Sequence, residues 1–368
     1  MRLRIFQHGR EVASFSGNSK DQSDASLEQE ILNARDDIYD SELFHELRRE
    51  AQLLTNQGVQ CTHDTIVLPY DKDKQIEISL PPTHDSPTEP SDNHTETALL
   101  KDLLLTFRLL LSQAHLQSLE ERSQPPPPIQ GGPQARPVYA ILKPILEILS
   151  HRTHVLGVDS ILRRLQGSMR KTGLPFNIST SRVDSQTSSV PPGSSRPQAV
   201  ADFIASLINT QFDLSFPDSA SSSTEDLTIK VSTSIAPPTF GTRYEVFQAS
   251  EKVTSNSTNT TFSALNDLQL EIEYRLQSIL RLHVLSIPGW KDAKLGARWI
   301  HRESRKGGGV KEDVAIDVER GEVKVAVMRK DGVNNRGGQS SKRAFLWSGE
   351  DGGEKRSLKD VLAVSSEG

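Results

Sequence analysis

The sequence predicts an α+β fold in which long amphipathic helices combine with small antiparallel sheets, in two domains with several disordered loops. Three observations lead to this prediction. Apolar residues recur at steps of three and four through long segments, short alternating runs lie between these segments, and loops rich in Ser and Pro separate them. The 368 residues have the length of about two domains. The hydrophobic fraction of 35% rises to about 41% when the 23 Gly are added, which is still below the roughly 45–50% of globular domains counted in that way, so part of the chain should be solvated.

The chain opens with strand-like runs at 2–6 and 11–15, and Gly9 between them predicts a hairpin turn. A long helix is predicted next, with one apolar face and a charged opposite face. Ser26 and Gln29 are placed to cap its start, and Gly58 is placed to end it. Its apolar stripe consists of Leu27, Ile31, Ala34, Ile38, Leu43, Leu47, Ala51 and Leu54.

Two further strands are predicted at 65–69 and 75–79, and a second helix follows and ends near Arg122. Leu105 and Leu109 widen the stripe of this helix, which predicts burial on more than one side. The stripe itself consists of Leu100, Leu103, Leu104, Phe107, Leu110, Leu111 and Ala114.

The proline run at 124–137 is the clearest boundary in the sequence, because consecutive prolines stop a helix and favour extended backbone. It predicts a first domain at 1–123, a proline-rich linker at 124–137, a mixed helix and strand domain at 138–348 and a flexible tail at 349–368. An alternative is that the proline run binds a proline-recognition module such as SH3 or WW.

The second domain is predicted to begin with two helices, or with one helix kinked at Pro144 and near Gly157. Turn-forming residues at 319–321 predict a hairpin. The other predicted elements are strands at 175–182, 227–235, 243–250, 314–318, 322–328 and 344–347, with helices at about 197–210 and 265–282. Disordered loops are predicted at 81–93, 184–197, 217–225 and 331–343.

Recognisable catalytic motifs are missing from the sequence, which has neither a G-x-S-x-G turn nor a G-x-x-x-x-G-K-[ST] phosphate loop. His151 and His154 share a helix face, but no third metal ligand can be nominated, so both are expected on the helix surface. The single cysteine, Cys61, is expected to be a half-buried apolar residue, and pairing it with His63 as a nucleophile would need an orienting group. We therefore expect no catalytic residues, no cofactor and no metal.

Charge is distributed unevenly along the chain. Residues 1–123 hold 12 Lys and Arg against 22 Asp and Glu, which disfavours contact between this region and nucleic acid phosphates. Sequence-specific nucleic-acid binding is not expected, because no aromatic residues are interleaved with the basic clusters. No stretch approaches the roughly 20 apolar residues of a membrane span, so no membrane contact is expected.

Three segments, in this order, resemble one known family. The segment DSELFHELRREAQLLTNQGV (40–59) resembles an acidic, apolar helix of subunit 17 of the Mediator complex. The proline run and the Ser-rich insertions resemble those of fungal members. LLLSQAHLQSLEERSQPPPPI (109–129) resembles the leucine-rich helix of the same family, which carries an Ala-His pair and runs into prolines. PVYAILKPILEIL (137–149) continues the resemblance.

The resemblance implies a non-enzymatic scaffold subunit of the Mediator head module, located in the nucleus, that acts as a coregulator of RNA polymerase II transcription. Its expected partners are the other head subunits and the polymerase II machinery. Helix faces would pack against the chain's own sheets and against neighbouring subunits. The candidate protein-interaction residues are Leu43, Leu47, Leu54, Leu103, Phe107, Leu111, Leu276 and Ile279.

The sequence departs from the family in two respects. Family members are considerably longer, so this chain is expected to be a C-terminal portion. The end of the second helix, Leu119-Glu120-Glu121-Arg122, is more acidic than the arginine-rich end of the family, so no polymerase or DNA contact is assigned to it. Two other hypotheses remain open: a stand-alone adaptor that binds through its proline run, and an unrecognised hydrolase that uses His151 or Cys61.

Overall fold

The computed structural model forms two compact units, each with its own apolar core. We call Met1–Thr153 the N-terminal unit; we call His154–Gln186, Asn209–Thr233 and Gly241–Gly368 together the C-terminal unit. The predicted α+β class, with long helices and small antiparallel sheets, is confirmed. The structure describes residues 1–17, 26–71, 73–80, 94–123, 138–182, 207–216, 226–234, 241–249, 260–287, 289–292, 299–303, 311–330, 340–348 and 354–364.

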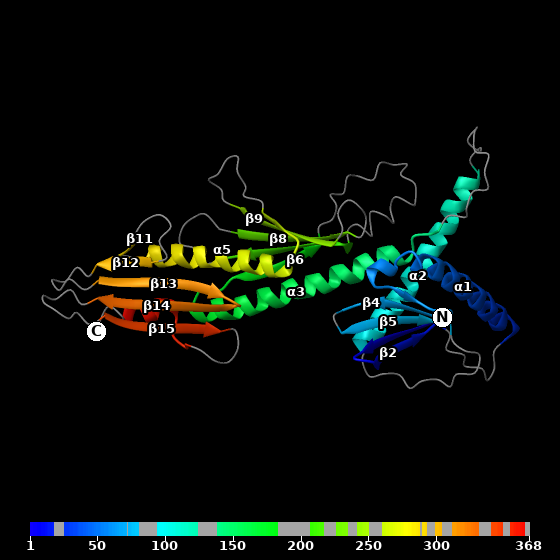
Figure 1. Ribbon diagram of the computed structural model, residues 1–368, viewed down its shortest axis with the longest axis horizontal. Helices are drawn as coiled ribbons and strands as arrows, with labels where there is room; N and C mark the ends of the chain where they lie inside the picture. Colours follow the sequence, from blue (N-terminus) through cyan, green and yellow to red (C-terminus); the bar gives the residue numbers. More distant parts are fainter. Residues whose placement is uncertain are drawn as a thin grey trace. The chain divides into compact units, whose positions relative to one another are not determined.

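The N-terminal unit contains an antiparallel sheet in the order β2-β1-β5-β4-β3 (Figure 1). Its first hairpin turns at His8 and Gly9, which both have a positive φ, of 51° and 76°. This is the conformation of a tight hairpin turn, and it confirms the prediction made from Gly9. The strands are β1 (Arg2–Gln7), β2 (Arg10–Ser16), β3 (Gln60–Cys61), β4 (Thr65–Pro69) and β5 (Lys74–Ser79).

Three helices pack on this sheet or beside it: α1 (Leu27–Ala51), α2 (His94–Ser123) and the first part of α3 (Leu142–Thr172). The predicted cap is confirmed, because the hydroxyl of Ser26 accepts a hydrogen bond from the backbone N–H of Gln29 at 3.3 Å. Gly58, with φ of 79°, ends the short 3₁₀ helix Thr55–Gln57 rather than α1 itself.

The start of α3 is held by Glu50 of α1. The Glu50 carboxylate accepts hydrogen bonds from the backbone N–H groups of Ile141, Leu142 and Lys143 at 2.6, 2.6 and 3.0 Å. These N–H groups have no partner within the helix, and a carboxylate is well suited to them because the helix N-terminus carries partial positive charge. Pro144 lies in the same first turn, where proline is tolerated, so α3 continues through it as one helix.

The boundary between the two units falls inside α3, between Thr153 and His154, and not at the predicted linker. The physical reason is that the first turns of α3 are apolar and pack into the N-terminal core through Leu142, Ile145 and Leu149. The predicted linker at 124–137 lies outside the described residues.

The C-terminal unit contains two sheets, in the orders β10-β9-β8-β7-β6 and β11-β12-β13-β14-β15. Alternate residues of β8 and β14 enter the core, as predicted from the alternation of apolar and polar residues. The strands are β6 (Asn177–Arg182), β7 (Asn209–Ser215), β8 (Asp226–Ser234), β9 (Gly241–Ala249), β10 (Thr260–Phe262), β11 (Trp290–Asp292), β12 (Trp299–Glu303), β13 (Lys311–Glu319), β14 (Glu322–Lys330) and β15 (Ser340–Ser348).

The rest of α3, together with α5 (Leu265–Ser286) and α6 (Leu358–Val364), completes the C-terminal core. Gly157 causes no break in α3. A Cβ at this position would lie 2.9 Å from Cδ2 of Leu265, so the glycine makes room for the first residue of α5.

The β13–β14 hairpin turns at Arg320 and Gly321, as predicted, with φ of 54° and 81°. Glu273 of α5, which is buried, accepts a hydrogen bond from the N–H of Gly321 at 3.0 Å. Ser168 of α3 donates a hydrogen bond to the carbonyl of the same glycine. The turn is therefore anchored to two helices.

The structure also differs from the sequence prediction in several shorter segments. α6 lies in the expected flexible tail and buries Leu358, Val361 and Leu362, because its apolar residues share one helix face. β7 occupies the end of the expected helix at 197–210, and the short strands β10, β11 and β12 were not predicted. The expected loops at 81–93, 184–197 and 217–225 lie outside the described residues, as do 331–339, whereas 340–343 form part of β15.

Candidate protein-interaction surface

The eight candidate interaction residues lie in the cores of their own units. Seven are buried, and Ile279 is partly buried against the core of the C-terminal unit. These apolar faces pack against the chain's own sheets and helices. The buried seven are Leu43, Leu47, Leu54, Leu103, Phe107, Leu111 and Leu276.

A second apolar stripe lies on the N-terminal half of α1 and is exposed. Leu27, Ile31 and Ile38 are 74%, 62% and 71% accessible, and Ala34 between them is also exposed. We call these four residues the α1 outer stripe. Such large apolar side chains are common singly on a protein surface, but a row of them on one helix indicates an interaction site.

The α1 outer stripe points away from the core because of helix geometry. Leu43 and Leu47 lie nine positions after Ala34 and Ile38, which is about two and a half turns at 3.6 residues per turn. Residues separated by this interval lie on opposite sides of a helix. The prediction that both sets share one face was wrong, because the five-residue step from Ile38 to Leu43 breaks the periodicity.

The helix α2 repeats the same arrangement. Its buried residues Leu100, Phe107 and Leu110 each precede an exposed leucine by nine positions. The predicted burial of a second side of α2 is therefore not found in the part of the chain that the structure describes. We call the exposed leucines the α2 outer stripe; they are Leu105, Leu109, Leu116 and Leu119, between 50% and 61% accessible.

Polar contacts fix the crossing of the two helices. Arg108 of α2 donates two hydrogen bonds to the carboxylate of Asp40 at 3.1 and 2.8 Å, and Asp40 also pairs with the Met1 amino group at 2.6 Å. The hydroxyl of Tyr39 donates to the carbonyl of Arg108 at 2.8 Å. Because Asp40 is buried, these charge-assisted bonds hold both outer stripes in defined directions.

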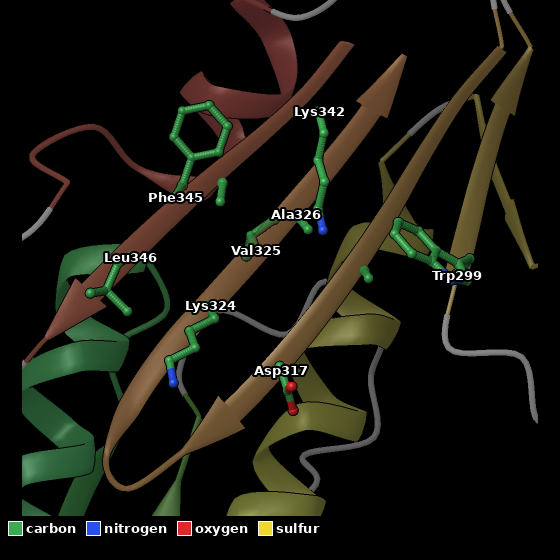
Figure 2. Close-up of a pocket in the computed structure, with 10 residues that line it drawn as sticks. Trp299, Asp317, Lys324, Val325, Ala326, Lys342, Phe345 and Leu346 are labelled. Atoms are coloured by element: carbon green, nitrogen blue, oxygen red, sulfur yellow. The ribbon is translucent and has the colours of Figure 1, made fainter. Parts of the chain in front are cut away.

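A hollow of about 480 Å³ lies on the outward face of β12–β15 (Figure 2). Its floor is a row of small residues, because Ala315, Ala326 and Ala344 are paired in register across three strands. Trp299 is paired with Ala315 and closes one end of this row. The hollow is mainly apolar, with Asp317, Lys324 and Lys342 among its lining residues.

The structure places His151, His154, Cys61 and His63 in different surroundings. His151 is buried and His154 is half-buried, so the expectation that both lie on the helix surface was wrong. Cys61 is half-buried beside the N-terminal core, as predicted, while His63 is exposed. Among the residues that the structure describes, no group of three or more His, Cys, Asp or Glu side chains is placed to hold a metal ion.

His154 forms a pair with Tyr244, which is fully buried. Nδ1 of His154 lies 2.6 Å from the hydroxyl of Tyr244. Burial lowers the pKa of His154 below 6.5 and raises the pKa of Tyr244 to about 12. The pair is therefore neutral at neutral pH and joins α3 to β9 within the C-terminal unit.

This pair predicts a pH-dependent stability. Because the native pKa of His154 is lowered, the unfolded chain binds a proton that the native chain resists, and the free energy of unfolding should fall as the pH drops below about 6.5. H154N should flatten this dependence. The three tryptophans, Trp290, Trp299 and Trp347, all lie in the C-terminal unit, so their fluorescence during urea unfolding at pH 5 to 7.5 measures the effect.

The matched control is H63N, which alters an exposed histidine of the N-terminal unit and should leave the dependence as in the unaltered chain. Equal slopes of stability against pH for H154N and the unaltered chain would contradict the assignment.

The sequence did not reveal the outer stripes as separate surfaces. Intervals of three and four residues between apolar positions, taken alone, do not distinguish two opposite faces of one helix. The nine-residue interval between apolar positions could have revealed them. Polar contacts between the two helices, such as that of Asp40 with Arg108, cannot be read from the sequence pattern, because the two residues are far apart in the chain.

No helix in the described part of the chain is long and apolar enough to cross a membrane.

Comparison with known proteins finds similarity to one subunit of the Mediator complex. A family model described as subunit 17 of the Mediator complex matches residues 1–169. The chain is 30% identical over 249 residues to the Mediator of RNA polymerase II transcription subunit 17 of Emericella nidulans, a match that covers 67% of this chain and 39% of that relative. It is 34% identical over 161 residues to the same subunit of Coccidioides immitis, covering 42% of this chain and 23% of the relative.

The chain thus spans 39% of the length of the Emericella nidulans relative. A solved structure of the Schizosaccharomyces pombe Mediator head module is 19% identical with a TM-score of 0.44, and the match covers 75% of this chain and 59% of that one. The resemblance predicted from the three sequence segments is confirmed.

Proposed function

We propose, from the place of residues 1–169 in the family of Mediator subunit 17, that this chain is a non-catalytic scaffold subunit of the Mediator head module. In this role it acts as a coregulator of transcription by RNA polymerase II. Its partners are the other head subunits and the polymerase II machinery, and its location is the nucleus. The family match carries this proposal, and the outer stripes supply a physical means of assembly.

The inner and outer faces of α1 and α2 have different roles in this proposal. The inner faces pack on the sheet β2-β1-β5-β4-β3 and stabilise the N-terminal unit. The outer stripes leave large apolar side chains in water, and covering them with a partner is favourable by about 25 cal/mol per Å² of apolar surface buried. Fold and assembly thus depend on different residues of the same two helices.

The experiment is reconstitution with the head subunits of the source organism. The full chain, carrying an affinity tag, is co-expressed with the other head subunits, and the purified material is analysed by size-exclusion chromatography and mass spectrometry. The unaltered chain should co-elute with several head subunits. The quadruple variant L105S/L109S/L116S/L119S should lose most of them, because the α2 outer stripe no longer offers an apolar surface.

The matched control is D102A/E120A, which alters exposed polar residues of the same helix and should co-elute as the unaltered chain does. Circular dichroism of each variant checks that α2 is still helical. Recovery of the unaltered chain without any other Mediator subunit would sink the proposal.

A further inference from the structure

The α1 outer stripe has the spacing of a helix-pairing seam. Its residues Leu27, Ile31, Ala34 and Ile38 follow steps of four, three and four. This is the heptad spacing at which two helices pack side by side along their length, with each apolar side chain fitting between those of the partner helix. A sheet or an extended peptide would not match this spacing, so the surface fits a helix.

The residues beside the stripe are mostly acidic. Glu30 and Asp37 follow each other at seven residues along one flank of the stripe. Along the opposite flank lie Glu28, Arg35 and Glu42, each seven residues after the one before. These positions correspond to the flanking positions of a heptad, whose charges decide which partner a helix accepts.

The excess of acidic residues on both flanks favours a partner helix with basic residues. A helix with Lys or Arg at its own flanking positions would meet opposite charges along both edges of the seam. A second copy of this chain would bring acidic residues against acidic residues, which disfavours self-association. The contacts between Glu42 and His115 at 3.2 Å, and between Arg35 and Asp36 at 3.4 Å, leave the net charge of this surface negative.

We infer that the α1 outer stripe docks an amphipathic helix of another polypeptide, with an apolar heptad seam flanked by lysine or arginine. The inference rests on the proposed scaffold function and specifies the kind of partner that this surface takes. Ala34, the smallest residue of the seam, gives a large apolar side chain of that helix space to approach the backbone of α1 closely.

The test uses two designed peptides and the full chain. Both peptides have four heptads with Ile and Leu in the seam; one has Lys at all flanking positions and the other has Glu. Fluorescence anisotropy of labelled peptide in about 150 mM salt, where surface charges are screened beyond roughly 8 Å, measures binding. The Lys peptide should bind saturably and at least about tenfold more tightly than the Glu peptide.

Three variants test where the peptide binds and what determines its charge preference. L27A/I31A/I38A keeps the charge of α1 and does not lower its helix propensity. It should reduce the affinity for the Lys peptide by at least about tenfold. L105A/L109A/L116A is the matched control on the α2 outer stripe and should bind as the unaltered chain does. E28K/E30K should reduce the preference for the Lys peptide. Circular dichroism verifies the helical content of each variant.

Several results would overturn the inference. These are equal binding of both peptides, binding that survives L27A/I31A/I38A, and no binding of either peptide by the unaltered chain. Analytical ultracentrifugation adds a further one, because self-association that L27A/I31A/I38A abolishes would make a second copy the occupant.

The outcome is separable from that of the proposed function. If the Lys peptide binds the stripe while no head subunit co-elutes, the scaffold role in Mediator fails and the helix-docking surface stands. If head subunits co-elute and the peptide does not bind, the surface assignment fails alone.

Discussion

Replacing Phe107 by alanine should lower the free energy of unfolding of the N-terminal unit by about 3–5 kcal/mol, the usual cost of a large cavity in a packed core. Phe107 is fully buried between the sheet and the helices of that unit. Hydrogen exchange of the β1 and β5 amides, which lie in the same unit, measures the loss, because their slowest exchange follows opening of the core.

The matched control is L105A, two positions away on the outer side of α2. Leu105 is 60% accessible, so its removal should change the stability by less than about 0.5 kcal/mol. Tryptophan fluorescence reports only the C-terminal unit, so the transition that it follows should move less in F107A than the exchange of β1. Similar destabilisation by F107A and L105A would contradict the division into inner and outer faces.

Replacing Glu50 by alanine should cost about 3 kcal/mol or more. The change removes the acceptor of three backbone N–H groups at the start of α3, and each buried donor left without a partner costs about 1–3 kcal/mol. Urea unfolding followed by far-ultraviolet circular dichroism measures the loss. The matched control is R35A, at an exposed position of the same helix, which should change the stability by less than about 0.5 kcal/mol.

The pH dependence gives a second measure of Glu50. Burial raises its pKa above 4.5 and outweighs the opposing effect of the three N–H groups. A carboxyl with a raised native pKa adds stability at low pH and loses this contribution as the pH rises through that pKa. The excess stability of the unaltered chain over E50Q should therefore shrink as the pH rises from about 4.5. An excess that grows with pH would contradict this account.

The sequence was sufficient for those elements whose pattern is local. The hairpin at Gly9, the cap at Ser26 and the turn at Gly321 each depend on a few neighbouring residues with specific backbone preferences, and all three were predicted. The long helices followed from their apolar periodicity, and the resemblance of three segments agrees with the family model that matches residues 1–169.

Other features depend on contacts between distant residues. The division inside α3 arises because Leu142 and Ile145 pack into a core built from residues far earlier in the chain, which a local pattern does not reveal. The candidate interaction residues were chosen from apolar stripes, and a stripe alone does not show whether the chain itself or a partner covers it.

The outer stripes also bear on the fate of the chain inside a cell. If a partner covers these stripes as proposed, a copy made without it exposes two rows of large apolar side chains, which chaperones and the degradation machinery recognise. Such an orphan copy should be short-lived and prone to aggregate when expressed alone. Its abundance would then follow the supply of the proteins that cover it, and co-expression with them should raise its soluble yield.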